Sequence, residues 1–262
     1  MYAFEIERPT TLQDAVAAIA GGGQALSGGQ TLIPTLKARL ADPGKLVSLH
    51  GVAELKGVCT DDDGRICIGA ATTHATVARE LAGSYPGLAS LAARIGDPAV
   101  RNRGTIGGSL ANNDPSACYP AGALASGATI VTNTREIAAD DYFQGMFATA
   151  LEEDEIITEV KFPVPRAAAY EKFIQPASRF PLVAVFVAKF DDGVRVAITG
   201  ASETGVFRWT EAEAALSSGF SAGALDGLRV DPDHMIADLH GDKAYRAHLC
   251  AVMTKRAVTA AA

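Results

Sequence analysis

The sequence is poor in cysteine, and the cysteines it has form no recognisable metal-binding motif. Four of them, Cys59, Cys67, Cys118 and Cys250, are scattered over 262 residues with no C-x-x-C pair. Iron–sulfur clusters and structural zinc sites are usually marked by closely spaced cysteines. We therefore expect no iron–sulfur cluster and no zinc in this chain, and reduced thiols, as is usual in the cytoplasm.

Long apolar runs and an excess of positive charge are also missing. No uninterrupted apolar segment reaches the ~18 residues of a membrane span. The opening residues 1–8 lack the basic and apolar regions of a signal peptide, so a cytoplasmic protein is expected. A net charge of −7 argues against nucleic acid as the main partner. With 48% hydrophobic residues, the chain is long and apolar enough for two globular domains.

The familiar nucleotide and catalytic signatures are absent too. No G-x-G-x-x-G lies between a predicted strand and helix, and no G-K-[ST] completes a P-loop. There is no nucleophile elbow and no zincin helix. We therefore assign no catalytic side chain and no metal ligand.

The most informative stretch is 98–120, PAVRNRGTIGGSLANNDPSACYP. It is too polar for a core segment and too rich in glycine for a helix interior. Backbone N–H groups exposed by such a loop can form a concave site for an anion such as a diphosphate. A plain glycine-rich turn between two strands is the alternative interpretation.

A similar loop, SGGQTLIP at 27–34, follows a short predicted strand at 24–26. Its glycines remove side chains where the backbone turns tightly or touches a ligand. Two such loops suggest two walls of one pyrophosphate site. If both are ordinary turns, the chain is instead a non-enzymatic binding module.

These two loops resemble the flavin loops of the medium subunits of molybdenum hydroxylases, the family of xanthine dehydrogenase and carbon monoxide dehydrogenase. The resemblance extends over nearly the whole chain, because GAATT at 69–73, YEKF at 170–173 and YRAHL at 245–249 are similar to landmarks of the same family. It implies an α+β fold: an FAD-binding domain of the PCMH or vanillyl-alcohol-oxidase type at 1–165, with subdomains at about 1–55 and 56–165. A small α+β C-terminal domain would follow at 168–262.

The resemblance also implies a set of cofactor-binding residues. Gly28 to Leu32 and Thr105 to Ser109 would bind the diphosphate, Asn112 and Asp114 would lie near the ribityl and ribose hydroxyls, Ile95 would pack on the flavin ring, and Lys172 would lie at its polar edge. The residues in this set are Gly28, Gly29, Gln30, Thr31, Leu32, Ile95, Thr105, Gly107, Gly108, Ser109, Asn112, Asp114 and Lys172. From the residues alone, Ile95 could equally be core and Lys172 a solvated strand residue. Many relatives carry an acidic residue at the position of Cys118. Buried packing and a polar contact are both open for this cysteine, and packing is the favoured interpretation.

The function implied by the resemblance is electron transfer within a larger complex. A partner large subunit would hold the molybdenum cofactor, and a partner small subunit two [2Fe–2S] clusters. The FAD of this chain would receive electrons from those clusters and pass them to a quinone, a nicotinamide or oxygen. The assembly would be a heterotrimer, paired into a hexamer. A stand-alone FAD-dependent oxidoreductase of the same fold superfamily is the alternative.

Hydrophobic periodicity and turn residues predict the elements around these loops. The glycines at 21–23 can end a helix or cradle a phosphate, and the aspartates at 61–63 can form a hairpin tip or bind calcium. His74 lies near the candidate site but could simply begin a helix. The predicted strands are 3–6, 24–26, 46–49, 57–60, 65–69, 129–132, 137–139, 156–162, 170–174 and 194–198; the predicted helices are 12–19, 35–40, 74–81, 88–95, 121–125, 140–147, 210–216 and 242–260, with 166–169 as a linker and 182–190 as strand or helix.

Overall fold

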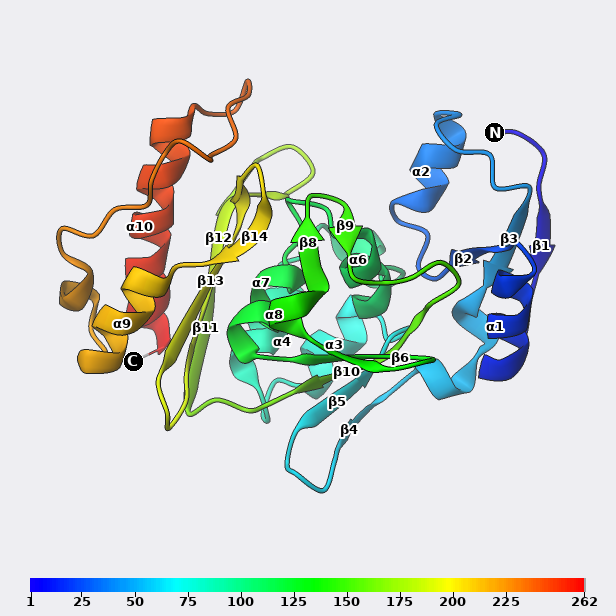
Figure 1. The fold of residues 1–262 in the computed structure, drawn as a ribbon, viewed down its shortest axis with the longest axis horizontal. Coiled ribbons are helices and arrows are strands. Elements are labelled where there is room, and N and C mark those ends of the chain that lie inside the picture. The colour runs from blue at the N-terminus through cyan, green and yellow to red at the C-terminus, as the bar shows by residue number, and fades with distance from the viewer. Residues whose placement is uncertain (262) are drawn as a thin grey trace.

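Three larger β-sheets follow one another along the longest axis of the molecule (Figure 1), and residues 143–149 form a fourth, two-stranded sheet. The coordinates are a computed structural model, and they describe residues 1–261. The three larger sheets are built from residues 5–48, 58–162 and 167–208, in chain order. Each sheet therefore comes from a continuous part of the sequence.

The first sheet is small and parallel, with strand order β1-β3-β2. Thr11 caps α1 by accepting a hydrogen bond from the Asp14 N–H, as expected of an N-cap threonine. The predicted strand at 24–26 is confirmed, but α2 begins three residues before its predicted start, which shortens the first glycine loop. The elements are β1 (Glu5–Glu7), α1 (Leu12–Ala20), β2 (Gln24–Leu26), α2 (Leu32–Lys37) and β3 (Lys45–Ser48), followed by the 3₁₀ turns η1 (Leu49–Gly51) and η2 (Ala53–Leu55).

The second sheet is antiparallel, in the order β4-β5-β10-β6-β7. The aspartates at 61–63 form the predicted tip of the β4–β5 hairpin. The residues at 140–147, expected to be helical, divide into the end of one short helix and a strand that pairs with β9. The elements are β4 (Val58–Thr60), β5 (Ile66–Gly69), α3 (His74–Glu80), α4 (Pro86–Ala93), α5 (Pro98–Arg101), α6 (Ile106–Asn112), α7 (Tyr119–Ser126), β6 (Thr129–Thr132), β7 (Glu136–Ala138), α8 (Ala139–Tyr142), β8 (Phe143–Gly145), β9 (Ala148–Thr149) and β10 (Ile157–Phe162).

The second glycine-rich stretch is not the open loop that its composition predicts. Gly107 and Gly108 lie in the first turn of α6, and Thr105 caps that helix by accepting from the Gly108 N–H. A Cβ on Gly107 would lie 2.5 Å from the Cβ of Ala70. The expectation of a non-helical segment was wrong because these glycines serve close packing of a helix on β5 rather than an open turn.

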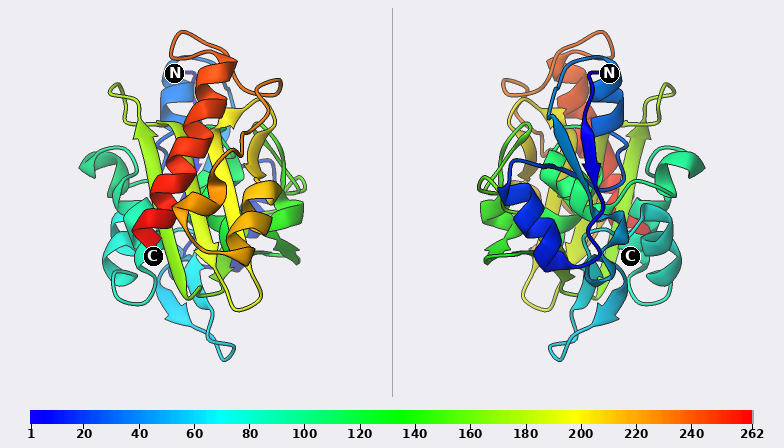
Figure 2. Two further views of the ribbon diagram at one scale, coloured as in Figure 1. Left: turned by 90° about the vertical axis from the view of Figure 1, so that its left-hand side faces the viewer. Right: turned by 90° about the vertical axis from the view of Figure 1, so that its right-hand side faces the viewer.

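The third sheet is antiparallel, in the order β11-β12-β13-β14, and α9 and α10 cover its outer face (Figure 2). The ambiguous run at 182–190 is a strand, and β11 includes most of the predicted linker. Thr210 does not cap α9; Trp209 holds that position, and Glu213 instead accepts from Arg208 and the Val196 N–H. The elements are β11 (Ala167–Ile174), β12 (Pro181–Lys189), β13 (Val194–Ser202), β14 (Gly205–Arg208), α9 (Thr210–Ser218), η3 (Ala222–Leu225) and α10 (Lys243–Ala261).

One large hydrophobic core joins the second and third sheets. Leu88 of α4 and Tyr119 of α7 are buried in the same cluster as Tyr170 and Phe186 of the third sheet. Small residues permit the close approach: a Cβ on Gly87 of α4 would lie 2.9 Å from the carbonyl oxygen of Ala168 in β11. These two parts of the chain are therefore packed as one unit.

No helix among residues 1–261 combines the length and apolar character needed to cross a bilayer.

Candidate cofactor-binding site

The two glycine-rich segments meet in space although 78 residues separate them. The hydroxyl oxygens of Ser27 and Thr105 are hydrogen-bonded at 2.8 Å. A Cβ on Gly28 would lie 2.1 Å from the carbonyl oxygen of Arg103, so no other residue fits there without moving the backbone. The two predicted walls of a site are therefore in direct contact.

A cavity of about 970 Å³ opens beside this contact, lined by residues of all three sheets and their connections. Its volume lies at the upper end of the roughly 300–1,000 Å³ of small-molecule and cofactor sites, so it has room for a dinucleotide. All thirteen residues predicted to bind the cofactor line it: Gly28, Gly29, Gln30, Thr31, Leu32, Ile95, Thr105, Gly107, Gly108, Ser109, Asn112, Asp114 and Lys172. The structure thus brings the whole predicted set together, while the contact that each residue makes with a cofactor remains a prediction.

The first loop offers a run of unused backbone donors to the cavity. Within residues 1–261, the N–H groups of Gly28 to Leu32 have no hydrogen-bond acceptor. Gly29 has φ +69°, the left-handed conformation that lets successive N–H groups point to one side. Five neighbouring donors without a carboxylate among them are suited to a diphosphate.

The second segment is different, because most of its N–H groups are already used. The N–H of Ile106 donates to Thr72, that of Gly107 to Ala70 and that of Ser109 to Thr105. The Gly108 N–H makes only a long 3.3 Å bond to the Thr105 hydroxyl. This segment therefore offers the cavity mainly polar side chains, of which the Ser109 hydroxyl is the first along α6.

Lys172 lies in the wall of the cavity and is not a solvated strand residue. It is 5% exposed, and its Nζ donates to the Arg94 carbonyl at 2.9 Å and to the Cys118 sulfur at 3.6 Å. Burial lowers the pKa of Lys172, and the charges of Arg94 and Arg101 add to that effect. The expectation that Cys118 only fills space was therefore incomplete, because its buried thiol accepts from this ammonium group.

His74 also lines the cavity, at the start of α3. It is 5% exposed, and its Nδ1 has no hydrogen-bond partner in the part of the chain that the structure describes. Its ring lies 5.3 Å from that of Tyr119, centroid to centroid. Burial lowers the pKa of His74 to about 4, so the imidazole is neutral at pH 7.

The charged residues of the lining that were not predicted include Arg179 and Glu155. Arg179 follows β11 in the connection to β12 and has φ +58°. Glu155 precedes β10 and is held by Thr132, Thr134 and Arg135 at 2.6–3.0 Å. No local motif marks either residue, because each comes to the cavity only through packing of distant elements.

A sheet-built cavity with free backbone donors at a loop–loop contact is the arrangement expected of a dinucleotide-binding protein. The sequence profile described as "FAD binding domain in molybdopterin dehydrogenase" matches residues 2–165. The chain is 32% identical to the carbon monoxide dehydrogenase medium chain of Afipia carboxidovorans, covering 97% of this chain and 95% of that one. It is also 32% identical to the nicotine 6-hydroxylase medium subunit of Paenarthrobacter nicotinovorans, again over 97% and 95% of the two chains.

Comparison with solved structures leads to the same family. A chain of the reconstituted CO dehydrogenase from Oligotropha carboxidovorans superposes with a TM-score of 0.90 at 31% identity, covering 99% of this chain and 98% of that one. Quinoline 2-oxidoreductase of Pseudomonas putida 86 gives a TM-score of 0.87 at 28% identity over 99% and 97%. This chain belongs to the family of FAD-binding domains of molybdopterin dehydrogenases, as the sequence resemblance implied, and FAD is its cofactor.

Proposed function

We propose that this chain holds FAD in the cavity between its three sheets and carries electrons from the iron–sulfur clusters of a partner subunit to an external acceptor. The observation that supports this best is the contact of the two glycine-rich segments beside a cavity large enough for FAD. FAD supplies the redox chemistry when it is bound, and the protein's part is binding, orientation and electrostatics.

The diphosphate is proposed to bind at the first loop. The five free N–H groups of residues 28–32 can each donate to a phosphate oxygen, and such charge-assisted bonds contribute roughly 1.5–3 kcal/mol each. Thr105, Gly107 and Gly108 form the opposite wall, where the Ser109 hydroxyl is the most accessible donor. Asn112 and Asp114 are proposed to bind the sugar hydroxyls: both line the cavity, and Asp114, whose Oδ1 accepts from the Ser116 N–H, has a second carboxylate oxygen to offer.

Three residues are proposed to set the properties of the flavin. Lys172 provides a buried positive charge, which favours a reduced, anionic flavin. His74 remains neutral and offers an uncommitted Nδ1. Ile95 lines the same cavity as Lys172 and provides an apolar surface, which is suited to an aromatic ring.

The complex is proposed to contain a large subunit with the molybdenum cofactor and a small subunit with two [2Fe–2S] clusters. Support comes from relatives named as medium chains and medium subunits, which this chain matches over 95% or more of their length in the two cases above. The same coverage favours a subunit over a stand-alone enzyme, because no additional substrate domain is present in the matched length. A paired heterotrimer in the cytoplasm, with a quinone, a nicotinamide or oxygen as acceptor, completes the proposal.

The domain division proposed from the sequence is 1–165 and 168–262, with the first part divided near residue 55. The extents of the three sheets and the 2–165 span of the family profile support this division, although one hydrophobic core spans the proposed boundary.

Purification of the native complex tests the proposal. We expect this chain to co-purify with two other chains, with molybdenum and iron in the complex and FAD released on denaturation. A flavin-bearing chain that purifies alone and oxidises a substrate by itself would overturn the subunit assignment.

A further inference from the structure

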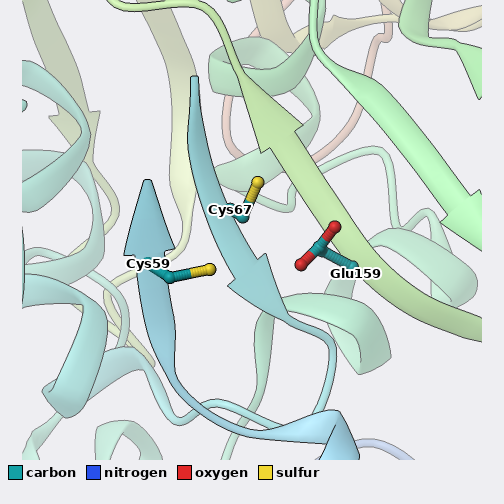
Figure 3. Close-up of side chains that lie close together, drawn as sticks. All are labelled: Cys59, Cys67 and Glu159. Carbon is teal, nitrogen blue, oxygen red and sulfur yellow. The ribbon is translucent and has the colours of Figure 1, made fainter. Parts of the chain in front are cut away.

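The hairpin β4–β5 and the adjacent strand β10 gather three potential metal ligands on one face of the second sheet (Figure 3). They are Cys59 of β4, Cys67 of β5 and Glu159 of β10. Their ligand atoms all lie within 4.8 Å of one another. Cys59 is exposed and Cys67 is buried, so the cluster is open to solvent on one side only.

Sheet register, not chance rotamers, holds this cluster together. Cys59 and Cys67 are directly opposite each other in the antiparallel pair, so their side chains share a face. Glu159 is opposite Gly69, two residues beyond Cys67, and period-two alternation puts it on that same face. The backbone therefore fixes three converging positions before any metal is present.

We propose that Cys59, Cys67 and Glu159 bind one thiophilic divalent cation, with Zn²⁺ as the expected ion and water as a fourth ligand. Zinc takes thiolate sulfur at about 2.3 Å and carboxylate oxygen at about 2.0–2.2 Å in a tetrahedral arrangement. Ligand atoms of such a site are about 3.5–3.8 Å apart. Small side-chain rotations close the present separations to that range, and two sulfur ligands select zinc over calcium or magnesium.

The charges around the cluster suit a cation. Two basic side chains near the cluster already have acidic partners: Lys161 pairs with Glu136 at 2.6 Å and Arg65 with Asp61 at 2.8 Å. In the metal-bound state, a divalent ion would offset the charges of two thiolates and the Glu159 carboxylate. Metal binding must displace the thiol protons, since burial raises the pKa of Cys67 to about 12.

The site lies outside the cofactor cavity, because none of the three residues lines it. β4 is the edge strand of its sheet, and its hairpin with β5 extends from the body of the molecule (Figure 1). An ion held by β4, β5 and β10 would tie this edge to the sheet interior. The bound ion would thus have a structural role that does not depend on FAD.

The test uses the full chain, reduced, treated with chelator and then reloaded with Zn²⁺. We expect one zinc per chain by elemental analysis, and X-ray absorption at the zinc edge with two sulfur ligands at about 2.3 Å. Cys59→Ser should weaken zinc binding by more than the roughly 10–100-fold that loss of an outer-shell partner costs. Glu159→Gln should weaken it less and keep both sulfur ligands.

Matched controls separate this site from adventitious binding. Cys250→Ala removes a buried thiol of α10, and Glu153→Gln removes an exposed carboxylate that is not part of the cluster; both should bind zinc like the parent. The exposed Cys59→Ser variant should keep its FAD content, which shows that it folds. A reduced chain that binds no zinc, zinc without sulfur ligands, or equal affinity in Cys59→Ser and the parent would each overturn the proposal. A zinc measurement on the native complex provides a second reading.

Discussion

The Ser27 hydroxyl and the Thr105 hydroxyl share a 2.8 Å hydrogen bond across 78 residues of sequence. Ser27 follows β2 of the parallel first sheet, and Thr105 is the N-cap residue of α6, so this bond joins the first sheet to the start of that helix. It fixes the first glycine loop against a rigid helix start, and the free N–H groups of the loop then face one cavity. The distance between the two sheets at this point is thus set by small side chains on both sides.

Gly28→Ala should disturb this contact directly. A Cβ would lie 2.1 Å from the Arg103 carbonyl oxygen, so the two segments must separate. We expect a loss of stability of about 1–3 kcal/mol, typical of overpacking, and FAD retention reduced at least roughly tenfold. Flavin absorbance after gel filtration measures the retention. Gly83→Ala, where a Cβ meets nothing within 4 Å, is the matched control, and equal flavin loss in both variants would disprove the role of the contact.

Lys172→Met should lower the reduction potential of the bound flavin while leaving most of the flavin in place. The substitution keeps the length of the side chain but removes a buried charge that favours the reduced form. For a two-electron couple we expect a decrease of about 30 mV or more, equivalent to about 1.4 kcal/mol. Spectroscopic titration with a reference dye gives the potential. Lys189→Met, on the far end of β12, should leave it unchanged; an unchanged potential in Lys172→Met as well would remove Lys172 from the site.

The success and failure of the sequence analysis follow from the range of the interactions involved. The strand at 24–26 and the β4–β5 hairpin were predicted because turn residues bound them locally. The helical state of Gly107 was missed because its reason is the 2.5 Å approach to Ala70, a contact between distant residues. Arg179 and Glu155 reach the cavity through tertiary packing alone, and the pairing of Cys59 with Cys67 depends on strand register. Composition reports none of these relationships.

His74 should make the protein sensitive to mild acid. Its pKa is about 4 in the folded chain and 6.5 in the unfolded chain, so only the unfolded chain takes up this proton between those values. The contribution of neutral His74 to the free energy of unfolding is therefore fully present above pH 6.5. It is lost as the pH falls toward about 4, which lowers that free energy by up to about 3 kcal/mol. Denaturant unfolding at a series of pH values should show this slope in the parent and a shallower one in His74→Gln. Parallel curves for the two proteins would refute the assignment.

Glu155→Gln should destabilise the chain even at neutral pH. Arg135 and the hydroxyls of Thr132 and Thr134 hold this carboxylate and lower its pKa to about 2. Removing the charge leaves Arg135 without its closest partner; because the Arg135 side chain is 42% exposed, solvent screens the pair and we expect a small decrease in the urea midpoint. In the parent, this contribution is present above pH 4.5 and is lost as the pH falls toward about 2. Urea unfolding compares the variant with Glu153→Gln, whose side chain is exposed; equal stability of the two variants would contradict the role of the pair.

A crystal structure of this chain with FAD tests the central claim most directly. The account predicts phosphate oxygens about 2.9 Å from backbone N–H groups of residues 28–32, with the flavin end of the cofactor toward Lys172. A diphosphate bound elsewhere on the molecule, or held only by residues 105–109 with the first loop turned away, would contradict it.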